Sequence, residues 1–180
     1  MWLEEIDEKW TLFLDRDGVI NTRNFDGYIT KVEDFIFTPH FLSSIPILSV
    51  IFGKIIVVTN QQGIGKEVMK EKSLLEIHRY MIREIHNVGG RIDQVFYASN
   101  LKNENNDRRK PLPAMGIEAK NQFPTIDFKR SIMIGDTNSD ILFGKNLGMK
   151  TILYKSAEKI TENADFEIDN FNELTIRLKR

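Results

Sequence analysis

Five short apolar runs recur along the chain and are separated by longer segments with a different periodicity. The runs are rich in Val, Ile, Phe, Leu and Tyr, and they lie at about residues 10–14, 54–59, 92–98, 131–135 and 150–154. Nearly continuous apolarity over so few residues is typical of strands buried on both faces of a parallel sheet. The pattern therefore predicts a central parallel sheet.

The segments between these runs predict helices. The clearest spans residues 70–88, where apolar residues return every three or four positions and so share one helix face. These residues are Leu74, Ile77, Met81 and Ile85. Gly89-Gly90 ends the segment. Further helices are predicted at about 40–52, 113–123 and 138–147.

The alternation of strands and helices predicts an α/β protein with a three-layer, doubly wound fold and right-handed crossovers. Nothing marks a domain boundary, so residues 1–180 are expected to form a single domain. Residues 20–38 are too long for a simple turn between the first strand and the first helix. We expect them to form a small flap over the crevice at the sheet edge.

The composition of the chain excludes several classes of site and partner. The chain contains no cysteine, which excludes disulfides, thiolate catalysis and cysteine-ligated zinc. Its net charge of −1 provides no electrostatic footprint for nucleic acid or for an anionic membrane surface. The acidic N-terminus is unlike a secretory signal, and the longest apolar region, around 45–58, is too interrupted to span a membrane. A cytoplasmic location is expected.

Polar side chains directly follow three of the predicted strands. They are Asp15, Asp17, Thr59 and Asp136. Because the carboxyl ends of neighbouring parallel strands border one crevice, these side chains are expected to converge, and Lys110 can join them from a loop. Carboxylates, a hydroxyl and a lysine around one point suit a metal-assisted reaction on phosphate.

Two acidic segments are candidates for holding the metal. In Asp15-Arg16-Asp17-Gly18, two carboxylates beyond a strand end can sit beside one hard cation such as Mg²⁺. An Asp-rich turn is the alternative. Asp136 can complete the metal site, and Asp140, one helical turn later, can orient Asp136 or Lys110. Helix capping is the alternative for this second segment.

Two further segments offer groups to a phosphate. Thr59-Asn60 presents a hydroxyl and backbone amides, although a turn or cap explains it equally well. Arg109-Lys110 supplies positive charge, and a solvated basic run is the alternative. His78 lies on the long predicted helix and shares no motif with the other histidines, which favours a structural role.

Taken in order, the four segments resemble the motifs of the haloacid dehalogenase superfamily of phosphohydrolases. Asp15-x-Asp17-Gly18 resembles the first motif, Thr59 the second, Lys110 the third, and Gly135-Asp136-x-x-x-Asp140 the fourth. A closer similarity is to its capless histidinol-phosphate and heptose-bisphosphate phosphatases, carried by segments 15–21, 27–29, 35–37, 59–64 and 109–111. This similarity implies a fold without a large cap domain.

The resemblance also implies roles for individual residues. Asp15 would be the nucleophile that forms an aspartyl-phosphate, and Asp17 the general acid and base. Mg²⁺ would be held by Asp15, Asp136 and the main-chain carbonyl of Asp17. Lys110 would add positive charge, and Thr59 would hold phosphoryl oxygens.

Asn60 and Arg109 would contact the rest of the substrate, which is expected to be a small phosphorylated metabolite. A sugar phosphate such as D-glycero-D-manno-heptose 1,7-bisphosphate is the first candidate. A second phosphate would suit the basic cluster Lys102, Arg108, Arg109 and Lys110. The alternatives are histidinol phosphate, a polynucleotide 3′-phosphate, which the net charge disfavours, and a non-enzymatic receiver-like phosphoacceptor. Asp17 favours turnover over stable phosphorylation.

The chain departs from these phosphatases in one respect. They often carry a cysteine-rich zinc loop just before Arg-Lys-Pro. The corresponding ligand positions are occupied here by Ala98, Asn100, Asn106 and Arg108. No zinc is therefore expected, and the loop must be held in another way.

Overall fold

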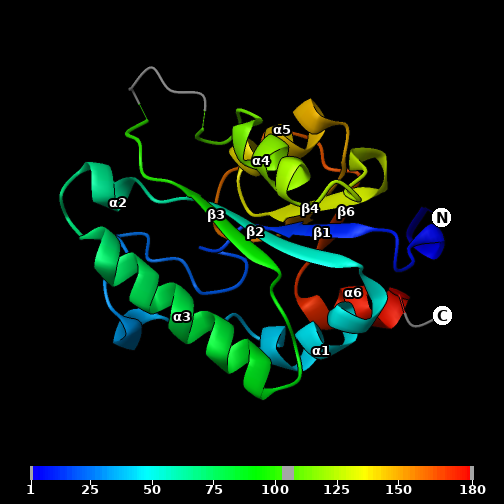
Figure 1. Cartoon of the computed structure of the whole chain (residues 1–180), viewed down its shortest axis with the longest axis horizontal. Coiled ribbons are helices and arrows are strands. Elements are labelled where there is room, and N and C mark those ends of the chain that lie inside the picture. The colour runs from blue at the N-terminus through cyan, green and yellow to red at the C-terminus, as the bar shows by residue number, and fades with distance from the viewer. Residues whose placement is uncertain (1, 103–107, 179–180) are drawn as a thin grey trace.

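A computed structural model describes residues 2–102 and 108–178 and shows six parallel strands in one sheet (Figure 1). The strands are β1 (Thr11–Leu14), β2 (Lys54–Asn60), β3 (Gln94–Ala98), β4 (Ser131–Gly135), β5 (Lys150–Tyr154) and β6 (Phe166–Ile168). The first five confirm the predicted runs. The sixth was not predicted, because three residues between polar segments carry too little apolar pattern.

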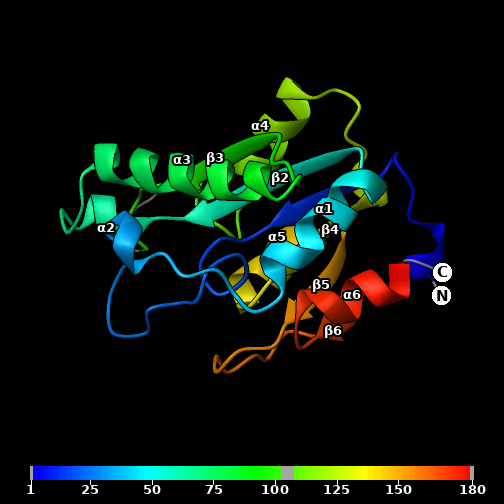
Figure 2. The same ribbon diagram turned by 90° about the horizontal axis from the view of Figure 1, so that it is seen from below.

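Helices cover both faces of the sheet, which confirms the three-layer α/β fold. The α-helices are α1 (Phe41–Ile51), α2 (Gln62–Gly65), α3 (Glu71–Asn87), α4 (Ala114–Gln122), α5 (Asn138–Leu147) and α6 (Phe171–Leu178). Short 3₁₀ helices are η1 (Trp2–Glu5), η2 (Val32–Asp34) and η3 (Phe128–Arg130). Figures 1 and 2 show α1, α3 and α6 on one face and α4 and α5 on the other. The sequence pattern did not predict α2 or α6.

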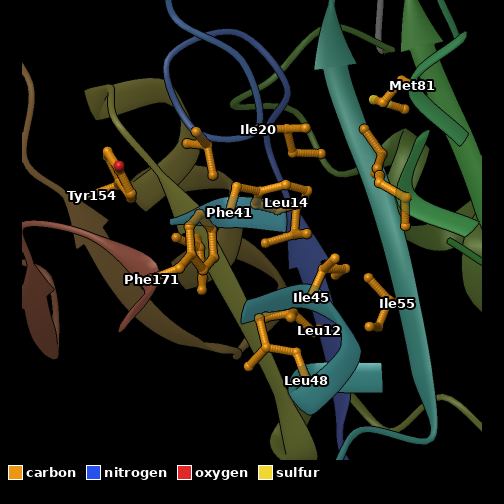
Figure 3. Packing of buried hydrophobic residues seen from close by; sticks show 14 of the residues in the cluster. Leu12, Leu14, Ile20, Phe41, Ile45, Leu48, Ile55, Met81, Tyr154 and Phe171 are labelled. Atoms are coloured by element: carbon orange, nitrogen blue, oxygen red, sulfur yellow. The ribbon is translucent and has the colours of Figure 1, made fainter. Parts of the chain in front are cut away.

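The strands divide their side chains between two apolar layers. Leu12 and Leu14 face the layer formed with α1, α3 and α6, whereas Phe13 faces the layer formed with α4 and α5. This alternation follows from the two-residue period of a strand and explains the continuous apolarity of each run. Figure 3 shows Phe41, Ile45 and Leu48 of α1 beside residues of β1 and β2, with Phe171 of α6 next to them.

The strand order β3-β2-β1-β4-β5-β6 reverses its direction of winding between β1 and β4. In a doubly wound sheet, the carboxyl ends of the strands at such a switch point form the ligand-binding crevice. Asp15 follows β1 and Asp136 follows β4. The backbone amide of Asp15 donates to the carbonyl of Ile134 at 2.9 Å, which ties the two strand ends together.

Residues 20–38 join β1 to α1 and are anchored at both ends. Ile20 and Phe35 are buried, and the hydroxyl of Thr38 donates to the carbonyl of Val19 at 2.6 Å. The middle of the segment, residues 23–29, borders a cavity at the switch point. This position fits the expected flap. In the part of the chain that the structure describes, no helix is both long and apolar enough to span a membrane.

Candidate active site

A cavity of about 530 Å³ opens at the carboxyl ends of the central strands. Seven of the residues expected to form the site line it: Asp15, Asp17, Thr59, Asn60, Arg109, Lys110 and Asp140. The eighth, Asp136, is fully buried next to them. The parallel topology therefore brings together side chains that the sequence separates by up to 125 positions, from 15 to 140.

Lys110 is a buried cation held from three sides. Its ammonium donates to Asp15 Oδ1 at 2.7 Å and to the carbonyl of Val58 at 2.7 Å, and it pairs with Asp140 Oδ1 at 2.6 Å. Burial alone would lower the pKa of Lys110, but Asp140 and Asp15 raise it. The ammonium thus makes two hydrogen bonds and a further ion pair, and one of the hydrogen bonds is directed at Asp15.

Asp15 is almost completely buried, and burial and the neighbouring charge of Asp140 raise its pKa to about 6 despite the contact with Lys110. A carboxylate with a pKa near 6 is ionised at neutral pH. It is also a better nucleophile than a carboxylate with an ordinary pKa, because basicity and nucleophilicity rise together.

Asp140 connects the site to the start of α5. Its Oδ2 accepts from the backbone amide of Thr137 at 3.0 Å and from the Thr137 hydroxyl at 2.6 Å, while its Oδ1 faces Lys110. Asp140 therefore caps the helix and orients Lys110 at the same time. The N-cap of α5 is Thr137, and the ion pair places Asp140 beside Lys110 rather than beside Asp136.

Asp136 has a partner that the sequence did not suggest. Its Oδ1 accepts from Arg23 Nη2 at 2.7 Å, and the same Nη2 donates to the main-chain carbonyl of Asp17 at 3.1 Å. Burial and the charge of Asp15 raise the pKa of Asp136 to about 8, although Arg23 acts to lower it. Arg23 lies in an aperiodic loop, so no pattern in the chain could have linked it to Asp136.

The residues around Asp136 fit a hard divalent cation. Oxygen atoms of Asp15, Asp136 and Asp140 lie within 4.8 Å of one another. The second oxygen of Asp136, Oδ2, is buried and has no hydrogen-bond partner among the described residues. A buried carboxylate oxygen without a partner is costly, and Mg²⁺ prefers such oxygen ligands.

Asp17 is held in place by three side chains. Arg16 Nη2 donates to its two carboxylate oxygens at 2.8 and 2.9 Å, Asn21 donates to Oδ1 at 2.9 Å, and Gln61 donates to Oδ2 at 2.8 Å. Burial alone would raise the pKa of Asp17, but Arg16 and the other donors lower it. In this conformation Asp17 is ionised, which is the state required to accept a proton from water.

Thr59 and Asn60 differ in what they contact. The Thr59 hydroxyl accepts from Gln61 Nε2 at 2.9 Å at the cavity wall. Asn60 donates to the carbonyl of Lys110 at 3.1 Å and accepts from its backbone amide at 3.0 Å. These two bonds fix the main chain of Lys110. Asn60, expected to contact the substrate, therefore holds Lys110 in the described conformation.

The expected basic cluster is divided by the fold. Arg109 and Lys102 line a second cavity of about 550 Å³ that shares several residues with the first. Lys110 is committed to Asp15 and Asp140. Arg108 instead donates to the carbonyl of Tyr97 at 2.8 Å and pairs with Glu118 of α4. Three of the four cations, Lys102, Arg109 and Lys110, therefore border the second cavity, and Lys110 is paired there with the site carboxylates.

These contacts of Arg108 anchor one end of the segment for which the sequence predicts no zinc. Arg108 occupies one of the four positions considered there and connects β3 to α4. Ala98 is buried in the layer beneath α4 and α5, and Asn100 follows the end of β3. The remaining position, Asn106, lies outside the described residues.

His78 is buried on α3 and contacts the Arg16 side chain, which holds Asp17 in the site. Its Nε2 lies 3.3 Å from Arg16 Nη1. Burial and the charge of Arg16 lower the pKa of His78 to about 3, so the imidazole is neutral and Nε2 can accept the hydrogen bond. The expected structural role of His78 thus extends to the residue that holds Asp17.

Comparison with known proteins gives one family model and a consistent group of relatives. The HAD-hydrolase-like family model matches residues 107–173. The D-glycero-alpha-D-manno-heptose-1,7-bisphosphate 7-phosphatase of Campylobacter jejuni is 34% identical over 148 residues, which cover 82% of this chain and 83% of the relative. The D-glycero-beta-D-manno-heptose-1,7-bisphosphate 7-phosphatase of Helicobacter pylori J99 is 32% identical over 143 residues, which cover 79% and 80%.

Solved structures share the fold. The D,D-heptose 1,7-bisphosphate phosphatase of B. bronchiseptica, complexed with magnesium and phosphate, superposes with a TM-score of 0.84 at 22% identity, covering 94% of this chain and 98% of that one. A HAD-like phosphatase structure from Mesorhizobium loti has a TM-score of 0.77 at 23% identity and covers 96% and 87%.

Proposed function

This chain belongs to the haloacid dehalogenase superfamily of phosphatases, and we propose that it is a magnesium-dependent phosphomonoesterase that acts through an aspartyl-phosphate on Asp15. The observation that carries this proposal is the position of Asp15 at the switch point. It faces the cavity beside Lys110 and next to two further carboxylates. An anion that attacks a phosphate anion requires such a concentration of compensating charge.

The reaction would proceed in two steps. In the first, a carboxylate oxygen of Asp15 attacks phosphorus, the bond between phosphorus and the sugar oxygen breaks, and Asp17 in its protonated form donates a proton to the leaving oxygen. In the second, the Asp17 carboxylate accepts a proton from water, and the resulting hydroxide attacks phosphorus. The bond from Asp15 to phosphorus breaks, and phosphate is released.

Asp17 must leave its contacts with Arg16 and Gln61 at least in part to act as the acid. Its side chain is one-quarter exposed and borders the cavity, so it can turn toward a substrate. Arg16 then remains fixed by His78. Asp17 would return to Arg16 as a carboxylate between the two steps, after it has donated its proton and before it accepts one from water.

Positive charge would come from two sources. Lys110 supplies a fixed ammonium beside Asp15. Asp15, Asp136 and the main-chain carbonyl of Asp17 would hold Mg²⁺, which when bound supplies charge that compensates the phosphoryl oxygens. Thr59 would donate its hydroxyl to one of those oxygens.

For the substrate, we propose a heptose 1,7-bisphosphate, cleaved at the 7-phosphate. Relatives with this named activity cover about four-fifths of the chain, and the cavity volume suits a small phosphorylated sugar. Arg109, Lys102 and Lys159 line the adjoining cavity and would receive the second phosphate. Histidinol phosphate would place an ammonium there, where like charges repel it.

The proposal is tested by phosphate release with Mg²⁺ from the alpha and beta heptose 1,7-bisphosphates, histidinol phosphate and a 3′-phosphorylated oligonucleotide. We expect kcat/KM to be highest for a heptose bisphosphate and Asp15→Asn to lower it by about 10⁴-fold or more. Arg109→Ala should reduce the preference for the bisphosphate. Highest activity on histidinol phosphate would refute the substrate, and persistent stoichiometric phosphorylation without release would indicate a receiver-like module.

A further inference from the structure

We propose that Arg23 is an internal cation that occupies the metal-binding position in the metal-free protein and is displaced when a divalent cation binds. The inference rests on the proposed metal site. It concerns a residue outside the four motifs, and it predicts that the chain itself limits its affinity for the metal.

The contacts of Arg23 coincide with those expected for the metal. Its Nη2 atom donates to Asp136 Oδ1 at 2.7 Å and to the main-chain carbonyl of Asp17 at 3.1 Å. Asp136 and the Asp17 carbonyl are two of the three groups proposed to hold Mg²⁺. Arg23 Nη2 already contacts the Asp17 carbonyl and one oxygen of Asp136, so a metal held by these two groups must displace it.

Burial makes the competition direct. Asp136 is fully buried and borders neither of the two cavities described above, whereas Arg23 lines both of them. Arg23 therefore contacts Asp136 and borders open space at the same time. A cation that enters from the cavities on this side meets the guanidinium before it reaches Asp136.

Charge explains why a cation is held there. Asp15, Asp136 and Asp140 form one buried acidic group, and of these three carboxylates Lys110 pairs with Asp15 and Asp140. Without Arg23, Asp136 would be a buried carboxylate with no cationic partner, which is a strongly destabilising arrangement. Arg23 supplies that partner while the metal is absent.

Arg23 has a second acceptor that it can keep when its guanidinium leaves Asp136. Its other terminal nitrogen, Nη1, donates to Glu158 Oε1 at 3.1 Å. The Glu158 side chain is more than one-third exposed and lines both cavities. The guanidinium can thus turn away from Asp136 and keep an anionic partner, which lowers the cost of displacement.

The test measures Mg²⁺ binding without substrate. Wild type, Arg23→Met and Arg83→Met are treated with chelator, dialysed and titrated with Mg²⁺ in a calorimeter. Arg83 is an exposed arginine of α3 paired with Glu84, so its variant controls for the loss of one positive charge. We expect Arg23→Met to bind Mg²⁺ about tenfold more tightly or better, because a charge-assisted hydrogen bond is no longer broken on binding. Arg83→Met should match wild type.

Crystal structures of the wild type grown with chelator and with Mg²⁺ provide a second readout that needs no variant. The contact between Arg23 and Asp136 should be present in the first and absent in the second. Unchanged or weaker Mg²⁺ binding by Arg23→Met, or persistence of the contact in the magnesium crystals, would overturn the role of Arg23 while leaving the phosphatase proposal intact. Failure of wild type and variant alike to bind Mg²⁺ would overturn both.

Discussion

Gly18 and Asp136 lie in such close contact that residue 18 has no room for a side chain. A β-carbon on Gly18 would lie 2.1 Å from Asp136 Oδ2, far inside contact distance. Gly18 also has a φ of +93°, a conformation that favours glycine. The glycine of the first motif thus permits the buried carboxylate after β4 to approach the turn after β1.

Gly18→Ala is therefore expected to displace Asp136 and to lower kcat/KM by about 100-fold, because moving this proposed metal ligand by about 1 Å would disturb the reacting geometry. Gly89→Ala is the matched control. Gly89 has a similar φ of +85°, but nothing lies within 4 Å of its β-carbon position. It should lose about 1 kcal/mol of stability from backbone strain and retain activity. Equal activity in the two variants would contradict this account.

Asp17→Asn should slow turnover by about 100-fold or more on an alkyl phosphate, since it removes the proposed proton donor for the leaving oxygen. An aryl phosphate leaves without much protonation, so its penalty should be clearly smaller. The measurement is kcat/KM for a sugar phosphate and for p-nitrophenyl phosphate in both proteins. The same loss on both substrates would show that Asp17 acts in another way.

His78 should make the stability of the protein depend on pH. Its folded pKa of about 3 lies below the ordinary value of 6.5, so below about pH 6.5 the unfolded chain binds a proton that the folded protein does not. The free energy of unfolding should therefore decrease as the pH is lowered. The contribution of His78 to this decrease should be about 2 kcal/mol between pH 6.5 and about pH 5.

His78→Gln keeps an acceptor for Arg16 but cannot titrate. Urea unfolding of both proteins at about pH 7 and about pH 5 isolates the effect, because the other titrating groups are common to the two. The decrease in stability should be about 2 kcal/mol smaller in His78→Gln. An equal decrease would mean that the imidazole is not held neutral against Arg16.

Chelation should abolish phosphatase activity and Mg²⁺ should restore it, because the proposed ligands are all oxygen atoms. Elemental analysis of the purified protein should show no stoichiometric zinc, since none of Ala98, Asn100, Asn106 and Arg108 offers a thiolate. Stoichiometric zinc, or activity that survives exhaustive chelation, would contradict this prediction.

The sequence predicted most of the sheet because a parallel strand buried on both faces requires apolar residues at nearly every position of a short run. Ile55 to Val58 in β2, for example, are all fully buried, so every position had to be apolar. The same reasoning located the site, since Asp15 and Asp136 follow strands that meet at the switch point. By contrast, β6 and α6 follow the polar segment 155–165 and are too short to give a recognisable apolar pattern.

The contacts of individual side chains could not be predicted in the same way. Arg23 reaches Asp136 across 113 residues from a loop without periodicity. Asn60 turns toward the main chain of Lys110 because the loop before α4 brings that backbone beside β2. Such contacts depend on the path of irregular segments, which the spacing of apolar residues does not encode.

The contacts of Arg108 with Tyr97 and Glu118 determine which solution conditions can disrupt the connection between β3 and α4. Guanidinium, carbonyl and carboxylate groups are neither oxidised by peroxide nor stripped by a zinc chelator, whereas zinc-bound thiolates are open to both. The contacts by which Arg108 joins β3 to α4 therefore depend neither on the redox state of the surroundings nor on a supply of zinc.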